Sequence, residues 1–238
     1  MKRLLFPLLL LLSASMGQAQ EAPASASVTP VPRPEAGLLK LHQSFNEISQ
    51  KGEAQLVFLG DSITQGWSGG GKEAWESTWA PMKAANFGIG GDRTEHVLWR
   101  LDNGNYDGLK PRLTVLMIGT NNTGHRMDAA ADTAAGIKAI IRKLQTKQPD
   151  MKILLLGVFP RGEKPSDPMR IRTTEINQLL PPLADGQKVF YEDISAVFLQ
   201  PDGTLSKEIM PDFLHLSPKG YKIWASSLAP KVADLMKP

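Results

Sequence analysis

Short apolar runs separated by longer amphipathic segments limit what this chain can fold into more than any other feature of its sequence. The clearest run, Leu-Thr-Val-Leu-Met-Ile at residues 113–118, is stopped by Gly119. Runs this short and this continuously apolar are typical of strands buried on both faces of a parallel sheet. We therefore expect five strands, at residues 56–60, 84–88, 113–118, 152–158 and 188–191.

The segments between and around these runs have the apolar spacing of helices. We expect helices at residues 35–51, 93–101, 128–148, 168–184 and 218–236. Strands that alternate with helices indicate a parallel sheet covered on both faces, which is a three-layer α/β/α fold. The chain has 238 residues, of which 42% are hydrophobic, so it is long enough for one domain with a sizeable core. We place this domain at residues 36–238.

The N-terminal residues are typical of a targeting segment rather than of the domain. Lys2 and Arg3 precede an apolar stretch at residues 4–12, and small residues follow it. This layout predicts a signal peptide at residues 1–19, which would export the protein to the periplasm or secrete it. The apolar stretch is too short to span a bilayer and no later one is longer, so we expect no integral membrane association. Residues 20–35, rich in Ala, Ser, Pro and Glu, predict a flexible linker.

Composition excludes several classes of site and partner. The chain has no Cys, so it can form neither disulfides nor thiolate metal sites. Lys and Arg exceed Asp and Glu by 27 − 24 = 3, and removal of Lys2 and Arg3 with the signal peptide would leave about +1. A charge this small gives no reason to expect a nucleic acid or an anionic membrane as a partner.

Ser62 is the first candidate for chemistry. It follows the expected strand at residues 56–60 in the turn Gly60-Asp61-Ser62. Ligands of open α/β sheets bind in the crevice beyond the carboxyl ends of the strands, so Ser62 is well placed to act. A lone Ser in a turn is more often a helix cap, and a catalytic role depends on partners elsewhere in the chain.

His215 is the best candidate for a base that activates Ser62. A Ser hydroxyl becomes a strong nucleophile when a base takes its proton and a third group orients that base. Of the four histidines, His215 stands out because Asp212 lies three residues before it, and both lie in a loop before the last expected helix. His42 and His96 are expected on helix surfaces. The reference pKa of a His side chain is ~6.5, so a mechanism with a His base predicts that activity falls on acidification.

Acyl transfer also needs hydrogen-bond donors for the negative oxygen of its intermediate. The amides of Gly90 and Gly91 follow the second expected strand, and the side-chain amide of Asn121 follows the third. Glycines in such a turn also have the simpler role of permitting a tight bend. Because the carboxyl ends of parallel strands share one edge of the sheet, we expect these turns to meet Ser62 there.

Taken together, four blocks in this order resemble those of the SGNH (GDSL-type) hydrolase family: Gly60-Asp61-Ser62, Gly91, Asn121 and Asp212-x-x-His215. Residues 86–92 and 97–101 are further similar to the branch that contains the platelet-activating-factor acetylhydrolase catalytic subunits. The resemblance covers residue 56 to the C-terminus. It departs from the family at Ile63 and Thr64, where the family name has Leu, and in the glycine-rich residues 68–71.

The resemblance implies a fold and a set of site residues. The fold is the flavodoxin-like SGNH hydrolase fold, with a five-stranded parallel sheet in the order 2-1-3-4-5. The implied catalytic triad is Ser62, Asp212 and His215. The implied oxyanion hole consists of the Ser62 and Gly91 amides with the Asn121 side chain. No metal or cofactor is implied.

The residues that would contact substrate are less well defined. Our candidates are Asp61, His125, Arg161 and Trp67. Trp67 lies shortly after Ser62 and could stack on a sugar ring. His125 lies just beyond Asn121 and either lines the site or is a solvated turn residue. Arg161 follows the fourth expected strand, and a surface role is its simpler interpretation.

The predicted function is that of a cofactor-free serine esterase that works through an acyl-enzyme. No insertion is long enough to form a large apolar lid, so a short acyl group, above all acetyl, is favoured over long chains. The substrate would be a small-molecule or glycan ester. Two alternatives remain: a lipid acylhydrolase of the lysophospholipase or thioesterase type, and a non-catalytic carbohydrate-binding domain on the same fold. The similar branch includes dimers, so a homodimer is an expectation by analogy only.

Overall fold

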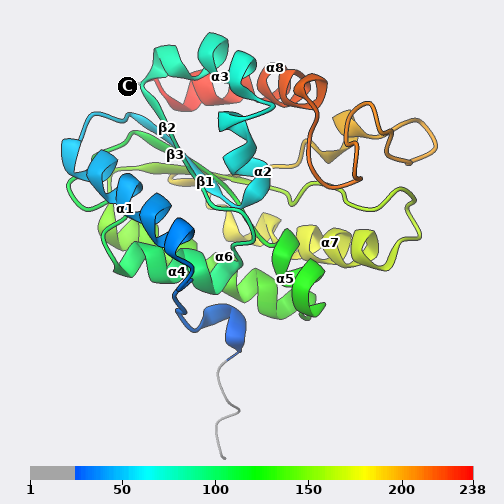
Figure 1. The fold of residues 1–238 in the computed structure, drawn as a ribbon, viewed down its shortest axis with the longest axis horizontal. Coiled ribbons are helices and arrows are strands. Elements are labelled where there is room, and N and C mark those ends of the chain that lie inside the picture. Colours follow the sequence, from blue (N-terminus) through cyan, green and yellow to red (C-terminus); the bar gives the residue numbers. More distant parts are fainter. Residues whose placement is uncertain (1–24, 238) are drawn as a thin grey trace, which may run out of the picture.

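The computed structural model describes residues 25–237, and the five predicted strands form one parallel sheet within it (Figure 1). The strand order is β2-β1-β3-β4-β5, and every neighbouring pair is parallel. The strands are β1 (Leu56–Gly60), β2 (Ala84–Gly88), β3 (Leu113–Met117), β4 (Lys152–Leu156) and β5 (Val189–Glu192). This confirms the predicted α/β/α class and the order 2-1-3-4-5. The predicted signal peptide lies outside the described residues.

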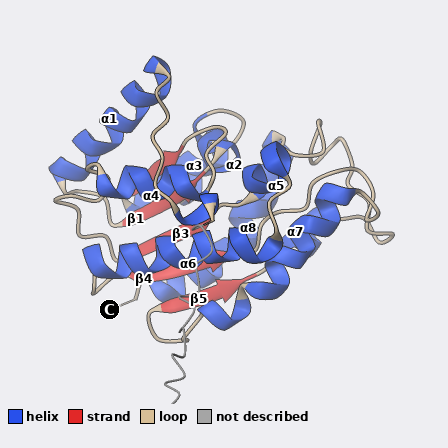
Figure 2. Cartoon of the chain, turned by 90° about the horizontal axis from the view of Figure 1, so that it is seen from below, coloured by secondary structure: helices blue, strands red, loops and turns tan. Residues whose placement is uncertain are grey.

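Helices cover both faces of the sheet (Figure 2). The helices are α1 (Ala36–Lys51), α2 (Ser62–Gln65), α3 (Lys72–Thr78), α4 (Thr94–Asp102), α5 (Thr120–Arg126), α6 (Ala130–Lys147), α7 (Pro168–Leu179) and α8 (Pro218–Leu235). Helices α1, α4, α6 and α7 cover one face, and α3 and α8 cover the other (Figure 1). No helix among residues 25–237 is both long enough and apolar enough to cross a membrane.

The core is divided by the sheet into two apolar clusters. Successive side chains of a strand point to opposite faces, so Val57 and Leu59 pack under α1 and α4, whereas Leu56 and Phe58 pack under α3 and α8. The second cluster is rich in aromatic rings. Because all five residues of β1 are buried, the strand is held firmly on both faces and its carboxyl end is a rigid support for the turn that follows.

The structure adds short helices that the sequence pattern did not reveal. Helices α2, α3 and α5 have only 4 to 7 residues, too few to show an apolar period. The predicted helix at residues 168–184 ends at Leu179, and Pro181 begins a separate 3-10 turn.

The placement of His42 and His96 on helix surfaces was wrong, because their exposed fractions are 6% and 3%. Burial lowers the pKa of His96 to about 4.

Residues 25–35 differ from the flexible linker that their composition predicts. They include a 3-10 turn at Ala26–Val28, and Ser27 is fully buried. The Thr94 hydroxyl donates to the Ser27 carbonyl over 2.8 Å, and the Ser27 hydroxyl donates to Asp128 over 3.0 Å. Polar contacts with distant residues hold this segment, and such contacts leave no apolar period in the sequence.

Candidate active site

Ser62 stands at the junction between β1 and α2, on a turn that leaves its backbone little freedom. It is the first residue of α2, and the Asp61 carboxylate caps this helix by accepting the Ile63 N–H over 3.0 Å. A Cβ on Gly60 would overlap the Met117 carbonyl oxygen and the Thr64 hydroxyl. Only glycine therefore fits at the end of β1, and the tight turn carries Ser62 to the edge of the sheet.

Asp61 was a candidate substrate contact, and the structure corrects this. Its exposed fraction is 1%, and its carboxylate is engaged with the Ile63 amide rather than open to solvent. Burial raises the pKa of Asp61 to about 7. The residue is thus a buried cap of α2 next to Ser62, and its side chain is not exposed to a substrate.

The structure brings Ser62, His215 and Asp212 into one chain of hydrogen bonds. Ser62 Oγ lies 2.9 Å from His215 Nε2, and His215 Nδ1 lies 2.6 Å from Asp212 Oδ2. Because an ionised carboxylate can only accept, Nδ1 must carry the proton that it donates to Asp212. Nε2 is then the acceptor for the Ser62 hydroxyl, which is the tautomer that a general base requires.

A compact turn holds Asp212 beneath the imidazole. Asp212 Oδ1 accepts the N–H groups of Leu214 and His215 over 3.1 and 2.7 Å. Phe213 has φ +57°, a left-handed conformation that is uncommon for a bulky residue and that clusters at functional turns. Partial burial alone would raise the pKa of Asp212, but the hydrogen bonds from the His215 ring and the two amides outweigh it and lower the pKa. The carboxylate is therefore charged and can balance an imidazolium.

Ser62, the glycine turn that adjoins it and Asn121, which is bonded to that turn, offer three unused or partly used donors. The amides of Ser62 and Gly91 donate to no protein acceptor among the described residues. A Cβ on Gly90 would lie 3.7 Å from Ser62 Cβ, so the glycine turn adjoins the nucleophile. Asn121 Nδ2 donates to the Asp92 carbonyl over 3.0 Å, which leaves its second hydrogen available. This arrangement can stabilise an oxygen that becomes negative when Ser62 attacks a carbonyl.

A buried ion pair supports the glycine turn, and sequence reasoning missed it. Arg100 Nε donates to Asp92 Oδ2 over 2.9 Å, and Arg100 Nη2 donates to the Gly60 carbonyl over 3.3 Å. Asp92 and Arg100 are both fully buried. Burial raises the pKa of Asp92 to about 6 although Arg100 opposes the rise. The one feature of the sequence that could have indicated this ion pair is a charged Arg between Leu98 and Leu101, on the inward side of α4.

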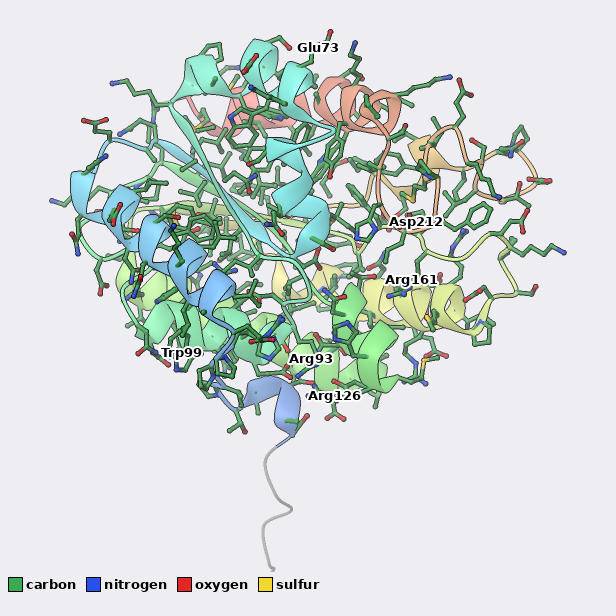
Figure 3. The ribbon with its side chains drawn as sticks, viewed as in Figure 1. Glu73, Arg93, Trp99, Arg126, Arg161 and Asp212 are labelled. Atoms are coloured by element: carbon green, nitrogen blue, oxygen red, sulfur yellow. The ribbon has the colours of Figure 1, made fainter. Side chains whose placement is uncertain are left out.

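Arg161 lies near Asp212 in a loop after β4 (Figure 3), whereas His125 lies on α5, the helix that begins at Thr120 just before Asn121. Arg161 Nη1 donates to the Thr120 carbonyl over 2.7 Å, whereas its Nε and Nη2 have no hydrogen-bond partner among residues 25–237. Burial lowers the pKa of Arg161, and the charges of Asp61 and Asp212 oppose the change. His125 is exposed, and its Nδ1 lies 3.2 Å from Nη1 of Arg93, which sequence reasoning also missed. Substrate contact by Arg161 and His125 stays a prediction.

Trp67 was the fourth candidate substrate contact, and this prediction was wrong. Its exposed fraction is 1%, and its ring packs 4.7 Å from the ring centroids of both Tyr221 and Trp224. Trp67 also lies edge-on to Phe58 of β1. Trp75 and Trp79 also lie against it, so the Trp67 ring has five aromatic neighbours and is a core residue that is not exposed to a sugar.

The candidate site is open rather than enclosed. The side chains of His215 and Asp212 are 44% and 55% exposed. A large cavity of about 1130 Å³ lies elsewhere, along β2 between α1 and α3, and none of the three hydrogen-bonded residues lines it. Within the described part of the chain, no group of three or more His, Asp or Glu residues could hold a metal ion.

Comparisons with known proteins identify a family. A family model described as the GDSL-like Lipase/Acylhydrolase family matches residues 58–223. The chain is 40% identical to the human platelet-activating factor acetylhydrolase IB subunit alpha1 over 184 residues, which are 77% of each chain. It is 44% identical to the alpha2 subunit from Rattus norvegicus over 173 residues, 71% of this chain and 72% of that one.

Solved structures share the fold at lower sequence identity. A GDSL-like lipase from Bacteroides thetaiotaomicron aligns with a TM-score of 0.61 and 21% identity, covering 81% of this chain and 96% of that one. Axe2, an acetylxylan esterase from Geobacillus stearothermophilus, aligns with a TM-score of 0.60 and 18% identity, covering 76% of this chain and 96% of that one. These two alignments show the fold alone.

Proposed function

The chain belongs to the GDSL-like lipase/acylhydrolase family, and from this premise we propose that it hydrolyses short-chain esters, above all acetyl esters, with Ser62 as the nucleophile. The family and its curated relatives identify the protein as a hydrolase of ester bonds. One observation carries the more specific proposal: the hydrogen-bonded chain from Ser62 through His215 to Asp212 lies beside unused backbone amides.

In the first step, Ser62 Oγ attacks the ester carbonyl carbon while His215 Nε2 takes the hydroxyl proton. The carbonyl oxygen becomes negative and accepts hydrogen bonds from the Ser62 and Gly91 amides and from Asn121. The charged carboxylate of Asp212 stabilises the imidazolium that forms. The bond to the alcohol then breaks, the alcohol leaves with the proton from Nε2, and the acyl group stays on Ser62.

In the second step, water takes the place of the alcohol. His215 Nε2 accepts a proton from the water as its oxygen attacks the acyl-enzyme carbonyl. The same donors hold the negative oxygen of the second intermediate. The bond to Ser62 Oγ then breaks, Oγ recovers a proton from Nε2, and the carboxylic acid departs. His215 and Asp212 return to their starting state.

The open shape of the site supports a short acyl group. A long acyl chain needs an apolar channel that removes it from water, and the large cavity along β2 is not lined by Ser62 or His215. The names of the curated relatives, which are acetylhydrolases, support acetyl as the group transferred. An open site is also compatible with an acetyl ester on a glycan, which stays a prediction.

A lipid acylhydrolase is the second candidate, and the curated relatives favour it. They are named for platelet-activating factor, and the chain is 40 to 44% identical to them. In that case the acyl group would still be short, but the alcohol would belong to a lipid. The carbohydrate-binding alternative has no support of its own, because Trp67, which was to stack on a sugar, is buried.

A set of p-nitrophenyl esters with Ser62→Ala tests the proposed function. We expect turnover of the acetate to exceed that of the octanoate and dodecanoate, and to fall by at least ~10³-fold in the variant. Ser226→Ala, on the exposed side of α8, is a matched control that should hydrolyse the acetate like the parent. Equal rates for Ser62→Ala and the parent would refute the nucleophile. Faster turnover of the dodecanoate would refute the short acyl group.

Export remains a separate proposal that is supported only by residues 1–19. It predicts that cells expressing the full chain hold esterase activity outside the cytoplasm. A chain that lacks residues 2–19 should keep that activity in the cytoplasm. Equal distribution of the two chains between the fractions would contradict a signal peptide.

A further inference from the structure

We propose that residues 25–35, here called the N-terminal strap, belong to the hydrolytic apparatus, and that Arg33 is a positioning residue for the Gly91 amide. The proposal rests on the proposed function, because it concerns the donors that would hold the negative oxygen. Its starting point is the location of the strap. Instead of leaving the domain as a linker, the strap crosses α4 and ends beside the glycine turn next to Ser62.

Buried polar contacts hold the N-terminal strap against the domain. Besides the bond from Thr94 to the Ser27 carbonyl and the bond from the Ser27 hydroxyl to Asp128, the hydroxyl accepts a hydrogen bond from Asn122 Nδ2 over 3.2 Å. A Cβ on Gly136 of α6 would overlap the Ser27 carbonyl oxygen, so that helix leaves room for the strap. Farther along, the Val31 N–H donates to the Glu95 carbonyl over 3.2 Å. These contacts direct the chain toward Arg33 along a defined path.

Arg33 contacts the glycine turn at two points. Its Nη1 donates to the Gly90 carbonyl over 3.4 Å and lies 3.6 Å from Asp92 Oδ1. That buried carboxylate oxygen has no hydrogen-bond partner among the described residues, so Arg33 supplies it with a nearby positive charge. Glu35 holds the guanidinium from the other side, with contacts to Nε and Nη2 of 3.1 and 2.9 Å. The Arg33 side chain is only 24% exposed.

The contact with the Gly90 carbonyl controls the direction of the Gly91 amide. The Gly90 C=O and the Gly91 N–H belong to one planar trans peptide, so they point in opposite directions. A guanidinium fixed on the oxygen therefore turns the N–H away from Arg33. The charged donor also polarises the peptide and strengthens the N–H as a donor. Gly91 has φ +78°, and its own N–H donates to no acceptor among the described residues, so no bond of that N–H fixes the plane of this peptide.

The contacts of Arg33 also affect a second donor, the side-chain amide of Asn121. Asp92 follows Gly91, and its carbonyl accepts Asn121 Nδ2 over 3.0 Å. Because Arg33 lies near the Asp92 oxygen that Arg100 does not contact, Arg33 helps to keep the Gly91 amide and the Asn121 amide in one arrangement. Arg33 touches no reacting atom. Its effect should therefore appear when the oxygen becomes negative and not when the substrate first binds.

Variants of the full chain test this role. Arg33→Met should lower kcat for p-nitrophenyl acetate about 10-fold, less than the ~10²–10³-fold expected for loss of a donor itself, and leave KM within about 2-fold. Arg33→Lys keeps the charge and should recover part of the loss. Glu35→Gln should lower kcat by a smaller factor. Arg142→Met, an exposed residue of α6, is a matched control that should equal the parent.

A tetrahedral analogue distinguishes positioning from general weakening of the fold. A trifluoromethyl ketone adds Ser62 to its carbonyl and creates the same negative oxygen, so Arg33→Met should weaken its inhibition about as much as it lowers kcat/KM. Assays well below the melting temperature of each variant remove effects of unfolding.

Unchanged kcat in Arg33→Met would overturn the proposal, and so would a loss confined to KM. If Arg33→Met does not fold, Arg33→Lys and Glu35→Gln decide: parental kcat and inhibitor affinity in both would overturn it. Failure of the proposed function is recognised separately, because Ser62→Ala would then retain parental activity. If Ser62→Ala is inactive while Arg33→Met equals the parent, only the positioning role fails.

Discussion

Ser62 and His215 are 153 residues apart in the sequence, yet Ser62 Oγ and His215 Nε2 lie 2.9 Å apart. Two rigid elements create this contact. The end of β1 and the start of α2 hold Ser62, while the turn at residues 212–215 precedes α8 and holds His215. Since both side chains are already within hydrogen-bond distance, proton transfer needs no large rearrangement of the backbone.

Asp212→Asn tests the orientation of the imidazole. An Asn side chain can present its amide group to Nδ1, which favours the tautomer with the proton on Nε2, where it cannot accept from Ser62. We expect kcat for p-nitrophenyl acetate to fall by up to ~10⁴-fold while the fold is retained. Asp202→Asn, an exposed residue in a neighbouring loop, should keep the parental kcat. A variant at position 212 with more than a tenth of parental kcat would contradict the role of Asp212.

Asn121→Ala tests the third donor. Loss of its side-chain amide should lower kcat by ~10²–10³-fold with little change in KM, because the missing hydrogen bond forms mainly after attack. Steady-state kinetics with p-nitrophenyl acetate measures both constants. Asn103→Ala, at the exposed end of α4, is the control and should not affect kcat. A rise in KM at unchanged kcat would instead assign Asn121 to substrate binding.

Asp61→Asn tests the buried helix cap through the pH dependence of stability. The pKa of Asp61 is raised by burial from 3.8 to about 7, so between these values the unfolded chain has lost a proton that the folded chain retains. Asp61 therefore contributes to a fall in the free energy of unfolding as pH rises through this window. Asn keeps an oxygen for the Ile63 amide but carries no charge.

The free energy of unfolding of Asp61→Asn, relative to that of the parent, should accordingly rise by about 1–4 kcal/mol as the pH increases from about 5 to about 8, at 1.4 kcal/mol per pKa unit. Urea unfolding of both proteins at the two pH values measures this difference. Exposed Asp150→Asn serves as the control and should follow the parent at both pH values. A gap between Asp61→Asn and the parent that does not widen with pH would show that the folded protein does not hold this proton.

Trp67→Ala tests the assignment of Trp67 to the core. Removal of a fully buried indole from among Phe58, Tyr221 and Trp224 should lower the free energy of unfolding by about 3–5 kcal/mol. KM for p-nitrophenyl acetate and for an acetylated glycan should stay near the parental values at temperatures where the variant is folded. A KM that rises for the glycan alone would restore Trp67 as a substrate contact.

Local pattern was enough to predict the layers of the fold and the three residues of the candidate triad. Apolar runs of strand length, such as residues 113–118, and amphipathic stretches between them determine a covered parallel sheet almost independently of detail. Ser62 and the pair Asp212 and His215 could be selected because each lies in a turn next to a strand or helix, and the family resemblance joined them. Helices as short as α2 and α5 have too few residues to show an apolar helical period, so the sequence did not predict them.

The remaining features depend on contacts between residues that are distant in the chain. Tertiary packing decided that Asp61 and Trp67 are buried rather than open to substrate, since neither residue type indicates its own exposure. It also decided that residues 25–35 form a strap and that Arg33 reaches the Gly90 carbonyl. Hydrogen bonds and ion pairs of this kind depend on where a partner lies in space, whereas apolar periodicity depends only on neighbours along the chain. For this physical reason the sequence by itself determined the sheet and its helices, and only the tertiary structure decided which polar groups support the site.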